Sequence, residues 1–257
     1  MDQRRAAAVS LRKLRQLSLR RVPGRADGKP AMKDAVLDRK GRKQETAPGY
    51  RRLVEHYENC FERHGATPQG VDWPDAGDLA TRFDVMTGVI RPDTKTCRLL
   101  DLGCGPGLLL DHLRDKAAPA PIRYLGIDLS EKMIAAARQR HPDESFEARD
   151  LLADPLKERC VDYVIMNGVL TEKRELPQAE MVAFAKEIIA AAFHAAEIGI
   201  AFNVMSTQVD WTRDDLFHWS CDEVLGFAAR ELTRHAVIRA DYGLYEYTTY
   251  LYRSPQR

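Results

Sequence analysis

The sequence predicts an α/β fold in which short buried strands alternate with helices along a doubly wound sheet. Short apolar segments occur at 99–102, 124–128, 161–166 and 199–205, and most of them are followed by an acidic or amide side chain. A long alanine-rich helical pattern at 176–196 lies between the last two of these segments. Two strand-like segments, 234–239 and 245–252, then close the chain as a predicted hairpin.

Length and composition limit the class of protein. A chain of 257 residues is long enough for one α/β domain with a full core. Its net charge of +1 does not indicate a nucleic-acid or anionic-membrane partner, and no apolar run approaches the roughly 18 residues that span a bilayer. The five cysteines show no C-x-x-C pair and no histidine at zinc spacing. They predict reduced thiols in a cytoplasmic protein, without a metal site.

The first 47 residues differ in composition from the rest. They contain 14 Lys and Arg against 5 Asp and Glu, which leaves the remaining chain acidic. We predict a disordered basic tail over 1–47, followed by one domain over 48–257. Within the tail, 9–22 has the pattern of a basic amphipathic helix, which suits a membrane surface, a protein partner or a transit segment. A dispensable tail, with Met32 as another start, is the alternative.

Two helices are expected before the sheet begins, and we interpret 48–92 as a helical cap. Leu53, Tyr57 and Phe61 recur at helical spacing in the segment 50–63. The second helix is expected over 77–90. The Rossmann-like core should then extend over 96–257, with an insert at 206–220.

The rest of the chain is organised around Leu99–Leu110, LLDLGCGPGLLL. A strand enters Asp101, glycines follow at Gly103, Gly105 and Gly107, and a helix begins directly after them, which predicts a turn that brings backbone against a nucleoside. Leu108 stands where a dinucleotide fingerprint needs glycine, and no Gly-Lys-Ser/Thr closes a P-loop. The Asp101 carboxylate suits a ligand that carries an ammonium or sulfonium charge.

This segment resembles motif I, D-x-G-x-G-x-G, of the class I S-adenosylmethionine-dependent methyltransferases. The layout before it, an aromatic-rich helix over 50–63, the turn Val71-Asp72-Trp73 and a helix that bears Arg82-Phe83, resembles small-molecule enzymes of bacterial biosynthetic clusters. The resemblance implies a Rossmann-like, doubly wound, seven-stranded sheet that is mostly parallel with an antiparallel last strand. It also implies S-adenosyl-L-methionine as the cofactor. It covers about 50–253.

The resemblance assigns cofactor contacts along the chain. Asp128, about 20 residues past the glycine turn, would accept the ribose hydroxyls, Met133 would lie on the adenine, and Asp150 would meet the adenine amino group. Arg82 would hold the methionine carboxylate or, alternatively, pair with Asp78. The predicted cofactor-binding residues are Tyr57, Trp73, Arg82, Asp101, Gly103, Cys104, Gly105, Asp128, Leu129, Met133, Asp150, Leu151, Asn167 and Gly168.

The insert at 206–220, STQVDWTRDDLFHWS, is the predicted acceptor site. His218 is the first choice for a base because its unperturbed pKa lies near neutrality, and Asp215 would orient it or act alone. The alternative is that the aromatic residues of the insert simply pack a lid. The predicted substrate-binding residues are Asn203, Trp211, Trp219, Tyr242 and Tyr245.

These features predict an enzyme that methylates a small molecule, most directly at a hydroxyl of a sugar or secondary metabolite. The alternatives are N-methylation of an amino sugar or peptide-like metabolite, in which Asn167, Glu172 or Asp215 accepts from the amine, and a non-catalytic scaffold that binds S-adenosylmethionine. The acidic core and the absence of an N/D-P-P-Y/F box after Asn167 argue against a nucleic-acid substrate. No membrane insertion is expected, and a homodimer remains open.

Overall fold

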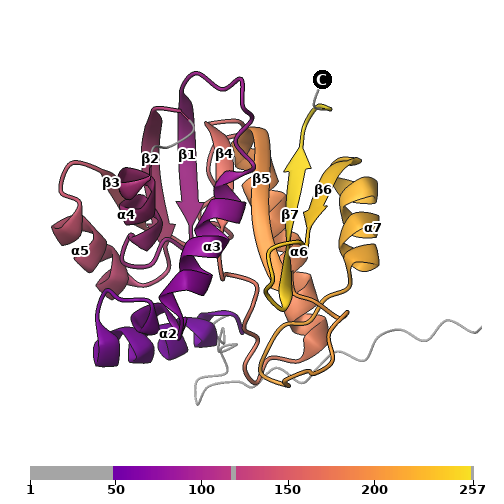
Figure 1. Cartoon of the computed structure of the whole chain (residues 1–257), viewed down its shortest axis with the longest axis horizontal. Helices are drawn as coiled ribbons and strands as arrows, with labels where there is room; N and C mark the ends of the chain where they lie inside the picture. Colours follow the sequence, from indigo (N-terminus) through magenta and orange to yellow (C-terminus); the bar gives the residue numbers. More distant parts are fainter. Residues whose placement is uncertain (1–48, 117–119, 256–257) are drawn as a thin grey trace, which may run out of the picture. The chain divides into compact units, whose positions relative to one another are not determined.

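The computed structural model describes residues 49–116 and 120–255, and it contains one seven-stranded sheet with helices on both faces (Figure 1). The predicted amphipathic segment 9–22 lies outside the described residues. The strands are β1 (Cys97–Leu102), β2 (Ile122–Asp128), β3 (Ser145–Ala148), β4 (Val161–Met166), β5 (Ala196–Met205), β6 (His235–Arg239) and β7 (Glu246–Tyr252). The helices are α2 (Arg51–His64), the 3-10 turn η1 (Gln69–Val71), α3 (Ala76–Thr87), α4 (Leu108–Asp115), α5 (Glu131–Arg140), α6 (Gln178–Ala195) and α7 (Cys221–Glu231).

The strand order is β3-β2-β1-β4-β5-β7-β6. β1 pairs in parallel with both β2 and β4, and β4 pairs in parallel with β5. β7 runs antiparallel to β5 and β6 and lies between them. The predicted fold class is therefore confirmed, including the hairpin at the end of the sheet. Because β1 and β4 lie side by side while their connections leave in opposite directions, the crevice at their carboxyl ends is where such sheets bind ligands.

Both faces of the sheet are buried, as the apolar strands require. In β1, Leu100 and Leu102 belong to a core cluster with residues of α6 and α7, whereas Leu99 packs in a second cluster with residues of α3, α4 and α5. The alternation follows from the two-residue period of a strand. The result is a three-layer arrangement in which the ends of the strands are available to form a site.

Helix α2 lies across the carboxyl ends of the strands (Figure 1). It is joined to the first turn of α5, where Ser130 caps the helix: the Ser130 hydroxyl accepts from the Met133 N–H at 3.2 Å and donates to Glu58 of α2 at 2.7 Å. Lys132 adds ion pairs to Glu58 and Glu62. The predicted helical cap is therefore present at the ligand-bearing edge.

In the described ranges, no helix has both the length and the apolarity needed to cross a membrane.

Candidate functional site

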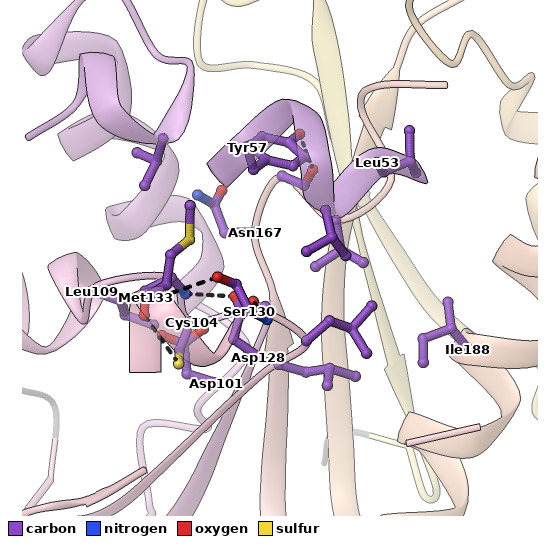
Figure 2. Close-up of a pocket in the computed structure, with 18 of the residues that line it drawn as sticks. Leu53, Tyr57, Asp101, Cys104, Leu109, Asp128, Ser130, Met133, Asn167 and Ile188 are labelled. Atoms are coloured by element: carbon purple, nitrogen blue, oxygen red, sulfur yellow. Dashed lines mark hydrogen bonds between the residues drawn. The ribbon is translucent and has the colours of Figure 1, made fainter. Parts of the chain in front are cut away.

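A largely apolar pocket lies between α2 and the carboxyl ends of β1, β2 and β4 (Figure 2). Its floor is the glycine turn, one wall is the start of α5 with the segment after β3, and α2 covers it. Thirteen of the predicted cofactor-binding residues line it, which are Tyr57, Trp73, Asp101, Gly103, Cys104, Gly105, Asp128, Leu129, Met133, Asp150, Leu151, Asn167 and Gly168. Arg82 does not line it.

The glycine turn can form only with glycine at its bends. Gly103, Gly105 and Gly107 have φ angles of 78°, 52° and 85°, in the region that favours glycine. A Cβ atom on Gly103 would also stand 2.4 Å from a Val169 methyl. Hydrogen bonds attach the turn to β2, because the N–H groups of Gly103 and Cys104 donate to the Ile127 carbonyl at 2.7 and 3.1 Å. The strand and turn together present backbone to the pocket at close range.

Asp128, at the end of β2, is held by backbone donors. Its two carboxylate oxygens accept from the N–H groups of Gly105 at 2.9 Å and Ser130 at 2.8 Å. Burial raises its pKa, although these backbone bonds oppose the shift. A carboxylate has about four lone-pair sites, so each oxygen can accept one further hydrogen bond from a ligand. This geometry suits a pair of vicinal hydroxyls.

Asp101 supplies a second carboxyl group under the turn. Burial raises its pKa to about 7, and the charge of Asp128 adds to the shift, while the hydroxyl of Tyr124 donates to it at 2.6 Å and opposes it. With a pKa of about 7, roughly half of the Asp101 carboxyl groups carry a proton at neutral pH. A positively charged ligand would favour its ionised form, as expected for an ammonium or sulfonium.

Asp150 connects the pocket wall to the cap. One of its oxygens accepts from the Tyr50 hydroxyl at 3.0 Å and from Arg51 at 2.7 Å, and the other accepts from the Leu152 N–H at 3.1 Å. Burial favours the neutral acid, but the bonds from Arg51 and Tyr50 outweigh it and lower the pKa of Asp150. The carboxylate predicted to meet adenine therefore also fixes the beginning of α2.

Asn167 follows β4 and lines the pocket with an unused acceptor. Its side-chain Oδ1 is buried and has no hydrogen-bond partner among the described residues. Gly168 next to it has a φ angle of 79°, donates to Asn203 Oδ1 at 2.8 Å, and accepts from the Tyr57 hydroxyl at 3.3 Å. The turn that presents Asn167 is thus held from α2 and from β5. A buried acceptor without a donor indicates a ligand group that fills that place.

The structure gives Arg82 a different place from the predicted one. Its Nε donates to both carboxylate oxygens of Glu246 at 3.0 Å, and its guanidinium lies 3.8 Å from the Trp73 ring centroid. Glu246 also accepts from Asn203 Nδ2 at 3.0 Å. The predicted carboxylate clamp and the alternative pair with Asp78 are therefore both replaced by a buried ion pair. Asn203, predicted as a substrate contact, acts instead as a link between Glu246 and Gly168.

The predicted base does not reach the pocket. His218 Nδ1 lies 2.7 Å from the Ser206 carbonyl oxygen, and His218 is absent from the pocket lining. Asp215 pairs with Arg213 at 2.5 Å and with Arg174 at 3.3 Å. The insert folds back on its own chain, so sequence proximity to β5 does not bring these side chains to the cofactor site.

The predicted aromatic acceptor wall is also displaced. Trp219 is 1% exposed and packs against Phe217 and Phe227 in the core, so its prediction as a substrate contact is wrong. Trp211 meets Tyr245 edge-on at 5.0 Å. Tyr245 lines a second, more open pocket, whose other lining residues are 206–210, Ala240, Leu244 and Glu246. The Tyr242 hydroxyl lies 3.0 Å from the Thr248 hydroxyl. These residues gather beside β7.

Several lining residues were missed from the sequence. Phe184 and Ile188 reach the pocket from one face of α6, and Tyr50 stacks on Phe184 with ring centroids 4.7 Å apart. Their i, i+4 spacing predicts a helix but not which layer its face meets. Glu246 was missed because nothing near it in the sequence indicates a buried anion.

The pocket fits the expected cofactor. Asp128 offers acceptors for a ribose diol, Asp101 offers a negative charge, and Met133 and Leu151 offer apolar surface for a base. Cys104 is buried, and burial raises its thiol pKa, so it acts by its small size and its backbone rather than as a nucleophile.

Comparison with known proteins agrees with this geometry. A family described as a methyltransferase domain matches residues 99–197. The chain is 30% identical over 153 residues to the putative methyltransferase Rv1506c of Mycobacterium tuberculosis, which covers 58% of this chain and 88% of that protein. It is 37% identical over 68 residues to a dTDP-3-amino-3,6-dideoxy-alpha-D-glucopyranose N,N-dimethyltransferase of Streptomyces fradiae, and this match spans only 25% of that protein.

The fold also matches solved structures. Magnesium protoporphyrin IX methyltransferase from Synechocystis, crystallised with S-adenosylmethionine, superposes with a TM-score of 0.53 at 16% identity. The match covers 82% of this chain and all of that one. At this identity the likeness concerns the fold.

Proposed function

The chain belongs to the class I S-adenosylmethionine-dependent methyltransferases and uses that cofactor, and we propose that its acceptor is a neutral amine nitrogen of a small molecule such as an amino sugar. The unpartnered Oδ1 of Asn167 in the cofactor pocket carries this proposal. The relative from Streptomyces fradiae, named as an N,N-dimethyltransferase of an amino sugar nucleotide, supports the same acceptor class.

S-adenosylmethionine supplies, when bound, a methyl group on positively charged sulfur that a nucleophile can displace. The protein's part is to align the acceptor and to exclude water. The cap helix serves the second purpose, because α2 covers the pocket and is bonded to the walls through Tyr57, Glu58 and Tyr50.

Asn167 serves the first purpose. An amide oxygen accepts a hydrogen bond from an N–H and so orients the nitrogen, but it does not remove a proton. A neutral amine needs no base before it attacks, whereas an alcohol does. The carboxyl groups of the described lining are engaged elsewhere: Asp101 with Tyr124, Asp128 with backbone N–H groups, and Asp150 with the start of α2.

A hydroxyl acceptor is the second candidate, and Glu172 is the observation that favours it. Glu172 lies in the loop that begins with Asn167, and its negative charge contributes to the raised pKa of Tyr57, a lining residue. Burial first, and then the charges of Asp72 and Asp215, raise the pKa of Glu172 itself. Glu172 itself is absent from the pocket lining, as His218 is, and its carboxylate pairs with Arg174 at 3.4 Å, which makes the hydroxyl the second candidate rather than the first.

Transfer of a ¹³C-labelled methyl group separates the two candidates. The purified chain is incubated with labelled S-adenosylmethionine and a panel of amino sugars and their hydroxyl counterparts, and the product carbon is identified by NMR. We expect an N-methyl signal that Glu172→Gln leaves in place. An O-methyl signal lost in Glu172→Gln would support the hydroxyl candidate and refute the amine.

A further inference from the structure

A cluster of three different metal-binding side chains lies behind the pocket wall, where α2 meets the segment before α3. It consists of His56, Cys60 and Asp72, whose donor atoms all lie within 4.8 Å of one another. His56 Nε2 is 2.7 Å from Asp72 Oδ2 and 3.9 Å from Cys60 Sγ. We propose that these residues form a binding site for a divalent ion of the zinc type. The proposal goes beyond the methyltransferase activity and does not rest on its acceptor.

The chemistry of the donors selects the ion. One imidazole, one thiolate and one carboxylate are ligands that Zn²⁺ accepts together, and hard ions such as Mg²⁺ avoid sulfur. Tetrahedral zinc at its usual bond lengths holds such donors about 3.3 to 3.6 Å apart. The two His56 distances lie on either side of that range, and the third, between the Cys60 sulfur and the Asp72 carboxylate, is at most 4.8 Å, so shifts of about half an ångström to one ångström would bring all three donors to one ion. Three protein ligands leave a fourth position for water.

The local structure holds the donors together without an ion. His56 and Cys60 are four residues apart in α2 and therefore share one helix face. Asp72 follows η1 with a φ angle of 62°, a left-handed conformation that aspartate tolerates better than most residues. The sequence shows the His-x-x-x-Cys spacing, but only the fold of 65–72 brings Asp72 to it. The prediction of no histidine partner for the cysteines was therefore incomplete.

The site is open to solvent on one side. Cys60 is 3% exposed, while His56 and Asp72 are partly open to solvent and give an ion a path to the site. Binding releases the Cys60 thiol proton to solvent, and His56 must carry its remaining proton on Nδ1, because the Nε2 that now shares a proton with Asp72 becomes a metal ligand.

An ion here would act on the cofactor pocket. Tyr57 follows His56, and Val71 and Trp73 flank Asp72; all three of these neighbours line the pocket. An ion shared by α2 and the η1 segment would hold two parts of the pocket wall in fixed relation. The bound ion would therefore stabilise the position of α2 over the pocket without taking part in methyl transfer.

Cobalt titration of the full-length, chelator-treated chain tests the proposal. Co²⁺ in such a site gives a thiolate-to-cobalt charge-transfer band and strong visible bands, which should saturate at one ion per chain and disappear when Zn²⁺ is added. Cys60→Ser should abolish the charge-transfer band, and Cys221→Ser, a half-buried thiol of α7, should leave it unchanged. A band that persists in Cys60→Ser, or the absence of any thiolate band in the unaltered chain, would overturn the site.

Because Cys60 is buried, a second variant guards against a folding defect. Asp72→Asn keeps the size and the tolerance for the left-handed conformation but loses the charged ligand. We expect its metal-free melting temperature to match that of the unaltered chain and its Co²⁺ affinity to fall by more than about 100-fold, since even outer partners of a metal ligand contribute about 10- to 100-fold. Unchanged cobalt affinity in Asp72→Asn would also refute the proposal.

Discussion

Replacing Arg82 by methionine tests the buried ion pair that ties α3 to β7. The substitution leaves the Glu246 carboxylate, whose side chain is 0% exposed, without its cation. Breaking a buried pair costs about 3 to 5 kcal/mol, and loss of the contact with the Trp73 ring adds about 1 kcal/mol. A domain of this size loses about 2 to 4 °C of melting temperature per kcal/mol, so a total loss of about 4 to 6 kcal/mol should lower the melting temperature by roughly 8 to 24 °C.

Two controls make the measurement specific. Lys116→Met removes an ion pair with Asp84 in which both side chains are about half exposed, and it should cost less than about 1 kcal/mol. In the Arg82→Met background, Glu246→Gln should recover part of the loss, because it removes the unpaired charge but keeps the shape. Thermal melting followed by circular dichroism reports all four proteins.

The same variant distinguishes the two roles considered for Arg82. A structural pair predicts a large loss of stability with S-adenosylhomocysteine affinity changed less than about tenfold in protein that is still folded. A direct clamp on the cofactor carboxylate predicts the reverse, with binding weakened by about 1.5 to 3 kcal/mol and little loss of stability. A melting temperature within 2 °C of the unaltered chain, estimated from about 1 kcal/mol, would refute the reasoning.

Three further predictions concern the pocket and its neighbours. Burial raises the pKa of Asp101 to about 7, so at pH 6 the free protein holds a proton on this carboxyl that a cationic ligand should displace. The measured enthalpy of S-adenosylmethionine binding should then depend on the ionisation enthalpy of the buffer. The Asp101→Asn variant should lose that dependence. If Asp101→Asn still released a proton on binding, the proton would come from another group and the reasoning about Asp101 would be refuted. His218→Ala should leave the rate of the chemical step unchanged, because the ring lies outside the pocket, and the loss of about 10²- to 10⁴-fold that removing a base causes would restore its predicted role. Gly168→Ala and Gly243→Ala should each lower the free energy of unfolding by about 1 to 2 kcal/mol, because both glycines have positive φ angles. Only Gly168→Ala, whose Cβ would lie 3.1 Å from the Trp73 ring, should also weaken cofactor binding. Equal cofactor affinity in the two variants would contradict the close packing of Gly168 against Trp73.

Local sequence patterns predicted the fold, and they predicted cofactor-binding residues that for the most part line one pocket. The glycine turn, Asp128 and Met133 lie on consecutive strands and helix starts, so their spacing alone places them at one edge of a parallel sheet. Positive φ angles, such as those of Gly103 and Gly105, favour glycine, so the glycines in the sequence indicate where the turn lies.

The acceptor side could not be predicted in the same way. Arg82 and Glu246 are separated by 164 positions, and their pairing depends on how α3 packs against β7. His218 and Trp219 occupy an insert whose path is set by β-bridges and core packing rather than by a periodic pattern. Where long-range packing decides the contact, the residue type alone does not reveal it.

Isothermal titration of the chain with S-adenosylmethionine and S-adenosylhomocysteine, compared with Asp128→Ala, tests the central assignment most directly. Asp128 lies at the end of β2 with both oxygens anchored by backbone N–H groups. We predict saturable binding by the unaltered chain, weakened by about 1 to 3 kcal/mol in Asp128→Ala and unaffected by Asp154→Ala on the surface. Equal affinity in the unaltered chain and Asp128→Ala, or no binding of either ligand, would contradict the account of this pocket.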